Sequence, residues 1–220
     1  TGTSNVGGLV GSKPWGTITN SYWDVDTSGQ ALGVGSGSTA GTIGLYSSAS
    51  SLSDPAKKSA YAASSYSGWD MATTGGSTSV WRIYDGYSYP LLRSFLTPLA
   101  VTANNVTQTY TKTAYSGSPG VTYSTSPSGL LLGTVSYGGS AIGAVNAGTY
   151  AITPSGLYST DNRGYDITFT SGTLTINQAP LTVTATTNTK TYDGTTSALA
   201  TPNTVNGQPR ASNSRRMRHT

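Results

Sequence analysis

Apolar residues that alternate with smaller or polar ones dominate the second half of the chain. Leu99, Val101 and Ala103 open the pattern. The same period of two returns in three later runs: Tyr150 and Ile152; Tyr165, Ile167 and Phe169; Leu174 and Ile176. This period is typical of strands with one buried face. Turn sequences such as SGSPG and YGGS separate the runs, so the pattern predicts a complete β unit over residues 98–179.

The opening strand of this unit recurs further along the chain. PLAVTANNVTQTY (98–110) and PLTVTATTNTKTY (180–192) share Pro, Leu, Val, Thr, Ala and Tyr at matching positions. We therefore predict that a second unit begins at residue 180. The alternation ends near Val205, and so short a unit cannot close a core, so residues 180–205 are predicted to be a truncated repeat.

Residues 1–97 differ, because their apolar runs are short and lie between glycines. Leu9 and Val10 stand between glycines, Ile18 between threonines, and Tyr22 and Trp23 before an Asp-rich turn. This order of strand, turn, strand and turn is typical of a solenoid coil, in which each coil stacks on the next.

One helix is predicted in this first part. Asp54 suits the N-cap, Pro55 suits the first helical position, and the good helix formers AKKSAYAA follow. Lys57 and Lys58 are interpreted as solvated residues of this helix.

Composition supports an all-β chain. Glycine contributes 28 of the 220 residues and tyrosine 15, while only 35% of the residues are hydrophobic. Such a composition favours short strands and tight turns. Cysteine is absent, which excludes disulfides and thiolate metal sites. Neither a signal segment nor an apolar run of 18 is visible, so we expect no membrane span and a piece of a longer protein.

The net charge of +4 is concentrated at the C-terminus. Residues 206–220 hold four of the twelve basic residues: Arg210, Arg215, Arg216 and Arg218. The rest of the chain has eight basic residues and eight aspartates, and a neutral body has no electrostatic footprint for nucleic acid. The Arg-rich tail is predicted to be disordered, and a basic tail that binds anionic surfaces is the alternative.

Three segments carry a resemblance to a known family. GGLVGSKPWGTITNSYWDVDTSG, which starts at Gly7, resembles the GLUG motif of large secreted bacterial adhesins of the filamentous haemagglutinin type. Residues 68–93 resemble the segment that closes a GLUG array. Residues 98 onward resemble the MBG (YDG-type) repeat domain, with Tyr192-Asp193-Gly194 in the second copy and Tyr115-Ser116-Gly117 in the first.

The resemblance implies both a fold and a function. It implies that residues 1–97 are the end of a parallel β-helix and that residues 98–179 form an immunoglobulin-like β-sandwich repeat. The function it implies is that of a stalk and adhesion segment on the bacterial cell surface, associated with the outer membrane. Its implied partners are a host-cell or surface glycan or protein receptor and an outer-membrane two-partner secretion transporter.

Aromatic residues suggest an alternative function, that of a carbohydrate-binding module. Trp15, Tyr22 and Trp23 are the candidate glycan contacts, because amphipathic aromatic surfaces stack well on sugar rings. The competing interpretation is that aromatics staple the coils together. That interpretation is preferred for two other groups: Trp69 and Trp81 as caps, and Tyr84, Tyr87 and Tyr89 as packing residues in turns and sheets.

No metal site or cofactor is expected. Asp24, Asp26 and Ser28 form a D-x-D-x-S-G pattern like that of a calcium loop. The twelfth position is Gly35 rather than Glu, so we favour a turn in which the aspartates bind backbone amides, and calcium binding is the alternative.

No catalytic activity is expected either. Asp24 with Asp26, or Asp70 with Asp85, are candidate acid and base pairs for glycan cleavage. However, the chain has no Glu, and its single His is His219 in the tail, so the usual acid and base residues are nearly absent.

One modification site is predicted. Asn105-Val106-Thr107 is an N-glycosylation pattern, and it indicates a surface strand or loop.

Overall fold

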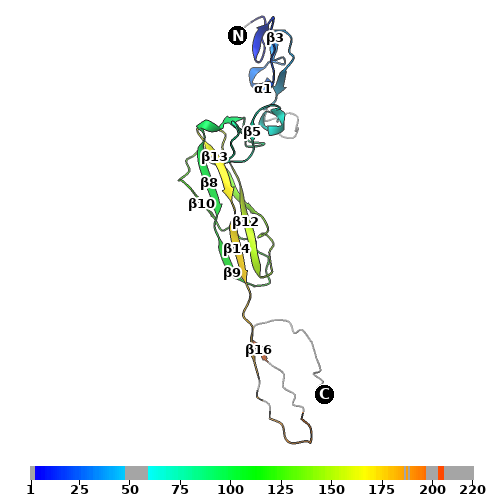
Figure 1. The fold of residues 1–220 in the computed structure, drawn as a ribbon, viewed down its shortest axis with the longest axis vertical. Coiled ribbons are helices and arrows are strands. Elements are labelled where there is room, and N and C mark those ends of the chain that lie inside the picture. The colour runs from blue at the N-terminus through cyan, green and yellow to red at the C-terminus, as the bar shows by residue number, and fades with distance from the viewer. Residues whose placement is uncertain (1–2, 48–58, 186, 188, 197–202, 206–220) are drawn as a thin grey trace.

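The computed structural model describes residues 3–47, 59–185, 187, 189–196 and 203–205 (Figure 1). The described residues form mostly strands, and only 7% of them are helical, which agrees with the predicted all-β class. The strand-containing parts follow one another along the long axis of the molecule (Figure 1). In the described part of the chain, no helix is long and apolar enough to cross a membrane.

Four short strands and one helical turn form the N-terminal part. They are β1 (Val10–Lys13), β2 (Ser21–Asp24), α1 (Val25–Ser28), β3 (Val34–Gly37) and β4 (Thr42–Leu45). β1 pairs in parallel with β3, and β2 pairs in parallel with β4. β1 therefore stacks on β3 and β2 stacks on β4, so the last two strands repeat the arrangement of the first two. The predicted strand positions Val10, Tyr22 and Trp23 lie in these strands, whereas Ile18 lies in the loop between β1 and β2.

Three glycines make room for the Trp23 side chain inside this stack. A Cβ atom on Gly33 would lie 2.8 Å from Trp23 Cζ3, and one on Gly44 would lie 2.9 Å from Trp23 Cζ2. A Cβ on Gly8 would lie closer still to the indole. Since Trp23 Nε1 also donates to the Gln30 carbonyl at 2.9 Å, the ring is held between the two strand pairs.

We predict that Gly33→Ala destabilises this part of the chain by about 1–3 kcal/mol, because the new methyl group would overpack against Thr42 and Trp23. Faster hydrogen exchange at β1–β4 amides would report the loss. Gly129→Ala is the matched control, because a Cβ there would meet nothing within 4 Å. Equal exchange in the two variants would contradict the prediction.

The next part consists of turns and very short strands. Its elements are η3 (Ala63–Ser65), β5 (Met71–Ala72), β6 (Trp81–Arg82), β7 (Leu91–Leu92) and η4 (Arg93–Phe95). β6 pairs in parallel with β5 and antiparallel with β7. Residues 54–58 of the predicted helix, with Asp54 and Pro55, lie outside the described residues, and residues 59–61 form a 3-10 turn.

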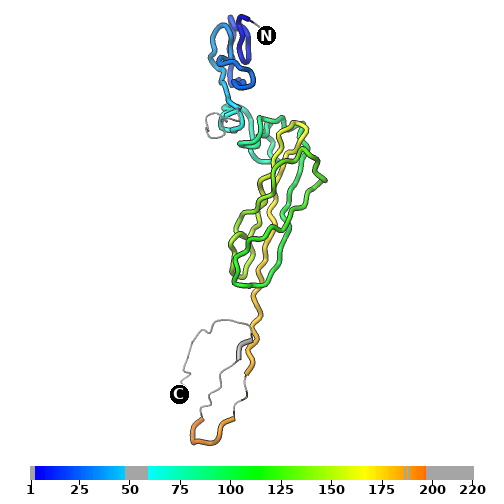
Figure 2. The backbone as a smooth tube through the Cα atoms, turned by 180° about the vertical axis from the view of Figure 1, so that it is seen from behind, coloured from blue at the N-terminus to red at the C-terminus, as the bar shows by residue number. Residues whose placement is uncertain are grey.

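Seven strands then form two sheets. They are β8 (Thr97–Ala103), β9 (Val106–Thr109), β10 (Val121–Tyr123), β11 (Leu132–Gly138), β12 (Gly148–Tyr158), β13 (Tyr165–Thr170) and β14 (Gly172–Asn177). One sheet has the order β10-β8-β13 and the other the order β11-β12-β14-β9. β8 and β13 are parallel, as are β9 and β14, and the other pairs are antiparallel. Figure 2 shows these long strands from behind.

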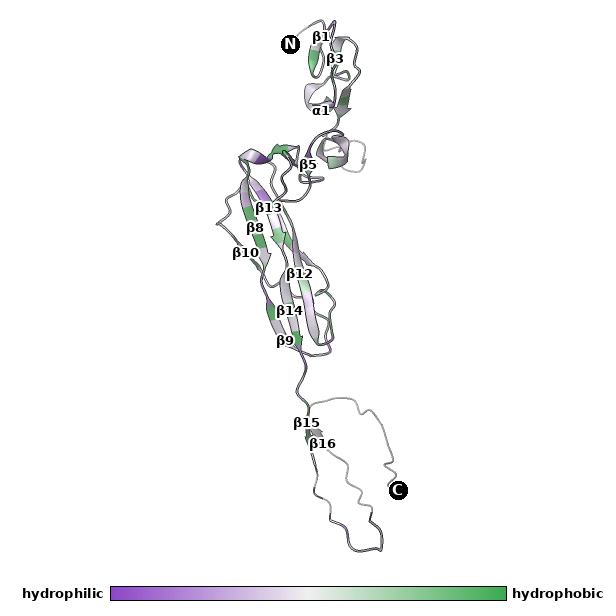
Figure 3. Ribbon diagram, in the orientation of Figure 1, coloured by the Kyte–Doolittle hydropathy of each residue, from purple (hydrophilic) through white to green (hydrophobic). Residues whose placement is uncertain are grey.

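The alternation in the sequence identifies the buried faces of these strands. Leu99, Val101 and Ala103 on β8 are buried, as are Ile167 on β13 and Leu174 on β14. Hydrophobic stretches lie along β8 in Figure 3. The predicted strand with one buried face is therefore confirmed for β8.

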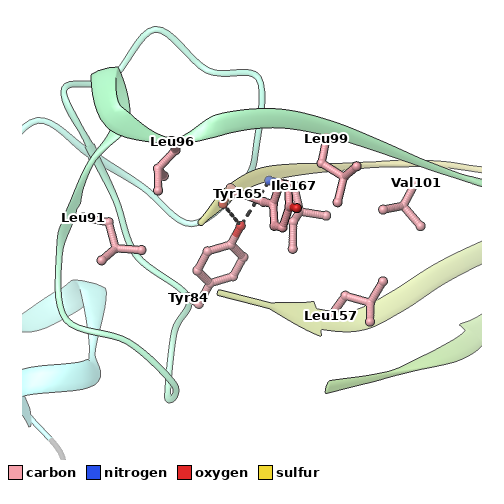
Figure 4. Close-up of a cluster of buried hydrophobic side chains, with 8 residues drawn as sticks. All are labelled: Tyr84, Leu91, Leu96, Leu99, Val101, Leu157, Tyr165 and Ile167. Carbon is pink, nitrogen blue, oxygen red and sulfur yellow. Dashed lines mark hydrogen bonds between the residues drawn. The ribbon is translucent and has the colours of Figure 1, made fainter. Parts of the chain in front are cut away.

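The core at one end of the two sheets includes residues from before β8. Leu99, Val101 and Ile167 pack there with Tyr84, Leu91 and Leu96 (Figure 4). A second cluster, with Ile152, Leu174 and Ile176, fills the other end. Residues on both sides of the predicted boundary at residue 97 thus share one hydrophobic core.

The last described strands form a hairpin of their own. β15 (Thr182–Thr184) pairs antiparallel with β16 (Asn203–Val205). Leu181 and Val183, which continue the alternation of the second repeat, are exposed. Residues 206–220, the predicted disordered tail, lie outside the described residues.

Candidate functional site

A cleft of about 290 Å³ lies where the β2–β4 strand pair meets the part that starts at residue 59. Most of its lining is aromatic, with the side chains of Tyr22, Trp23, Tyr66, Trp69, Trp81 and Tyr89. Asp24 is the one charged residue among the described residues that line it. We call this feature the aromatic cleft.

The rings of the cleft are packed against one another. Trp69 and Trp81 are stacked with their centroids 4.6 Å apart. Tyr22 meets Tyr66 edge-on at 5.0 Å and Trp69 edge-on at 5.7 Å. Such pairs add roughly 0.5–1.5 kcal/mol beyond the burial of their surface, so the rings hold their positions firmly.

Backbone carbonyls fix the polar ends of three of these rings. Tyr22 Oη donates to the Ser67 carbonyl and Tyr66 Oη to the Ala60 carbonyl, both at 2.7 Å. Trp69 Nε1 donates to the Asn20 carbonyl at 2.9 Å. Burial raises the pKa of Tyr66, so its phenol stays neutral. The rings thereby connect residues 20–24 to residues 60–69.

Asp24 is held at the cleft by several donors. Its Oδ1 accepts from the amides of Asp26 at 2.9 Å and Thr27 at 3.2 Å, which makes Asp24 the N-cap of α1. Its Oδ2 accepts from the Tyr89 hydroxyl. Burial raises the pKa of Asp24, but hydrogen bonds from Ser47, Tyr89 and the backbone outweigh it and keep the pKa below its ordinary value.

The other polar residues of the D-x-D-x-S-G pattern also bind backbone amides. Asp26 Oδ2 accepts from the Ser47 amide at 2.7 Å, and Ser28 Oγ accepts from the Gln30 amide at 3.2 Å. This is the turn that the pattern predicts. Within the described ranges, no three His, Cys, Asp or Glu residues are grouped so that they could hold a metal ion.

The three predicted glycan contacts lie in different surroundings. Tyr22 and Trp23 both line the aromatic cleft, although Trp23 is also packed on the glycines of the coil. Trp15 does not line the cleft, and its side chain is 87% exposed in the turn before β2. Sequence reasoning did not place Tyr66, Trp69, Trp81 and Tyr89 beside Tyr22, because no spacing links positions so far apart.

The remaining candidate residues are engaged in local structure. Asp70 Oδ2 accepts from the Val80 amide at 3.0 Å, and Asp85 Oδ1 accepts from the Ala63 amide at 2.8 Å. Each aspartate therefore holds a turn, and neither lines the cleft. Asn105, in the predicted glycosylation pattern, is exposed between β8 and β9, and its Oδ1 accepts from the Thr173 amide at 2.8 Å.

The tyrosines assigned to packing differ in their partners. Tyr84 is buried, and its hydroxyl donates to the Tyr165 carbonyl at 2.6 Å and accepts from the Ile167 amide at 3.1 Å (Figure 4). Tyr87 stacks on Tyr158 with a centroid separation of 4.3 Å.

A buried ionic cluster lies near Tyr84, and no pattern in the sequence predicts it. Arg82 Nε is 3.5 Å and Arg93 Nη1 is 2.5 Å from the Asp166 carboxylate, whose side chain is only 8% exposed. The Gly76 amide also donates to Asp166, at 3.1 Å, and the Arg82 guanidinium lies 3.9 Å from the centre of the Tyr84 ring. Arg82 and Arg93 precede residue 97, whereas Asp166 lies on β13 of the two-sheet unit. The cluster therefore joins the short strands β5–β7 and the turns around them to the two-sheet unit.

Asp24 gives a testable dependence of stability on pH. Because its folded pKa is below the ordinary 3.8, ionised Asp24 stabilises the fold above that pH, and the stabilisation is lost as the pH falls through the folded pKa. Asn also caps helices, so Asp24→Asn should keep the turn but make the melting temperature less dependent on pH in acid. Melting curves from about pH 5 to pH 2 would test this. Identical slopes for the two proteins would contradict it.

Comparison with protein-family models, with curated proteins and with solved structures found no match to this chain.

Proposed function

We propose that this chain is a structural stalk and adhesion segment of a large secreted cell-surface adhesin of the filamentous haemagglutinin type. The observation that carries the proposal is the succession of stacked parallel strands, connecting turns and a two-sheet unit along one axis (Figure 1). In such an arrangement each unit contacts mainly its neighbours, so repeated units add length. Length and reach are what a stalk requires.

The finer fold assignment belongs to the same proposal. β1–β4 would be two coils at the end of a parallel β-helix, with β1 and β2 in one coil and β3 and β4 in the next. This assignment follows because β1 pairs in parallel with β3, and β2 pairs in parallel with β4. β8–β14 would be an immunoglobulin-like sandwich, and β15 would be the first strand of the next repeat. The GLUG and MBG (YDG-type) resemblances support both assignments.

The contacts between residues 82–93 and β13, which we call the joint, suit an element that resists mechanical force. Asp166 on β13 forms ion pairs with Arg82 and Arg93, and the Tyr84 hydroxyl forms hydrogen bonds with the backbone on both sides of Asp166. A pull along the axis would have to break these buried contacts together. We therefore propose that the joint transmits force between the coils and the sandwich.

The cellular setting is also part of the proposal. The chain would reach the bacterial surface through an outer-membrane two-partner transporter and would hold a binding region toward a glycan or protein receptor. It would catalyse no reaction, since the proposed task is mechanical.

Small-angle scattering of the full chain tests the stalk proposal. A compact 220-residue protein has a radius of gyration of about 17 Å, whereas a stalk should give a clearly larger value and an elongated distance distribution. The fragment 70–179 should give a shorter maximum dimension than the full chain. A compact particle would overturn the proposal.

Adhesion is tested separately. Beads coated with the chain should attach to host cells more than beads coated with a non-adhesive protein, and soluble chain should compete. If the scattering shows a rod but the beads do not attach, the stalk role stands and the adhesive role is lost.

A further inference from the structure

We propose that the aromatic cleft binds a neutral pyranose ring, with Tyr89 and Asp24 as its polar contacts and aromatic faces as its platform. This inference goes beyond the stalk role and does not depend on it. It rests on three properties of the cleft: its aromatic lining, its phenol–carboxylate pair and its size.

The aromatic lining suits the apolar face of a sugar. A pyranose ring presents C–H groups on its faces and hydroxyls around its edge, so it combines an apolar surface with a polar rim. Tyr22, Trp69 and Trp81 line the cleft and are only partly buried, so part of each ring remains accessible. Their contacts with one another keep them in place before a ligand arrives, which reduces the ordering cost of binding.

The phenol–carboxylate pair supplies directional contacts. The Tyr89 side chain is exposed to 39%, and its hydroxyl donates to Asp24 Oδ2 and also interacts with the side chains of Ser47 and Tyr61. Asp24 is itself oriented by the amides of Asp26 and Thr27. The carboxylate and the phenol therefore lie in fixed positions beside the aromatic platform, as the polar groups that the hydroxyls of a bound sugar would meet.

The charge of the cleft selects the class of sugar. Asp24 is the one charged residue among the described residues of the lining, and the hydrogen bonds it receives favour its ionised form. An anionic sugar such as a uronic acid would be repelled. A neutral hexose or N-acetylhexosamine meets no such penalty.

The size of the cleft limits the ligand. Its volume of about 290 Å³ is at the lower end of the roughly 300–1,000 Å³ usual for small-molecule sites. One sugar ring fits this space, so the cleft should hold a terminal or single internal residue of a glycan rather than a long chain.

Tryptophan fluorescence and saturation-transfer NMR on the full chain test the proposal. The probes are glucose, galactose, mannose and N-acetylglucosamine, with glucuronic acid as the charged comparison. At least one neutral sugar should bind saturably below about 10 mM and more tightly than glucuronic acid.

Three variants locate the binding. Tyr89→Phe removes one hydroxyl, and Asp24→Asn removes the charge while keeping the N-cap, so each should weaken binding about tenfold. Trp15→Ala removes an exposed aromatic outside the cleft and should leave binding unchanged.

Several results would overturn the proposal. These are no saturable binding of any neutral sugar, tighter binding of glucuronic acid, or unchanged binding in both Tyr89→Phe and Asp24→Asn. Loss of binding in Trp15→Ala would overturn it as well, because the site would then lie elsewhere.

Discussion

Asp166→Ala should destabilise the protein by about 3–5 kcal/mol, because it leaves two arginines in a buried site without their counter-charge. The side chains of Arg82 and Arg93 are only 4% and 13% exposed, so water replaces the lost carboxylate poorly. The Gly76 amide would also lose its acceptor. Urea unfolding followed by circular dichroism would measure the loss.

The matched control is an exposed ion pair on the same unit. Arg163 bonds Asp161 at 3.2 Å, and its side chain is 83% exposed, so Arg163→Ala should change the stability very little. Asp166→Asn keeps the shape but removes the charge, and should fall between the two. If Asp166→Ala were as stable as Arg163→Ala, the cluster would not hold the joint together.

The fragment 98–179 should be much less stable than the fragment 70–179. Beginning at residue 98 removes Tyr84, Leu91 and Leu96 from the core that Leu99 and Ile167 share. Deleting a large buried side chain typically costs about 2–5 kcal/mol, so losing three approaches the roughly 5–15 kcal/mol that hold a whole domain folded. It also removes both arginines that pair with Asp166.

Thermal unfolding of the two purified fragments would check this. The longer fragment should melt cooperatively, and the shorter one should melt far lower or lack a cooperative transition. Tyr84→Phe in the longer fragment separates the hydroxyl from the ring, because it removes only the bonds to the Tyr165 carbonyl and the Ile167 amide. Equal melting temperatures for the two fragments would show that the sandwich needs nothing before residue 98.

The strands could be predicted from the sequence, because the alternation that marks a strand involves residues close together in the chain. Leu99, Val101 and Ala103 alternate in the sequence and are buried together on β8. Asp24 and Ser28 bind amides two or three residues away, as short polar residues in a turn usually do, whereas Asp26 binds the amide of Ser47, which follows β4.

The predicted helix lies mostly outside the described residues, whereas the predicted aromatic contacts can be compared with the structure. Asp54 and Pro55 lie outside the described residues, so that prediction stays a prediction. The aromatic character of Tyr22 and Trp23 predicts glycan contacts, and both residues line the cleft. The same character predicts Trp15 as a contact, but Trp15 does not line the cleft, because residue type carries no information about where a side chain lies in the fold.

The sequence by itself determined the period of the strands and the turn at Asp24, since both depend on residues close together in the chain, and the repeated segment at residues 180–192 is visible in it directly. Only the tertiary structure decided that Asp166 would meet Arg82 and Arg93, and that Tyr22 would share a cleft with Tyr89. These contacts join positions about 65 to 85 residues apart, and they form only after the strands have paired and the turns have closed. No local sequence pattern records such pairings, because the partners become neighbours only in the folded chain.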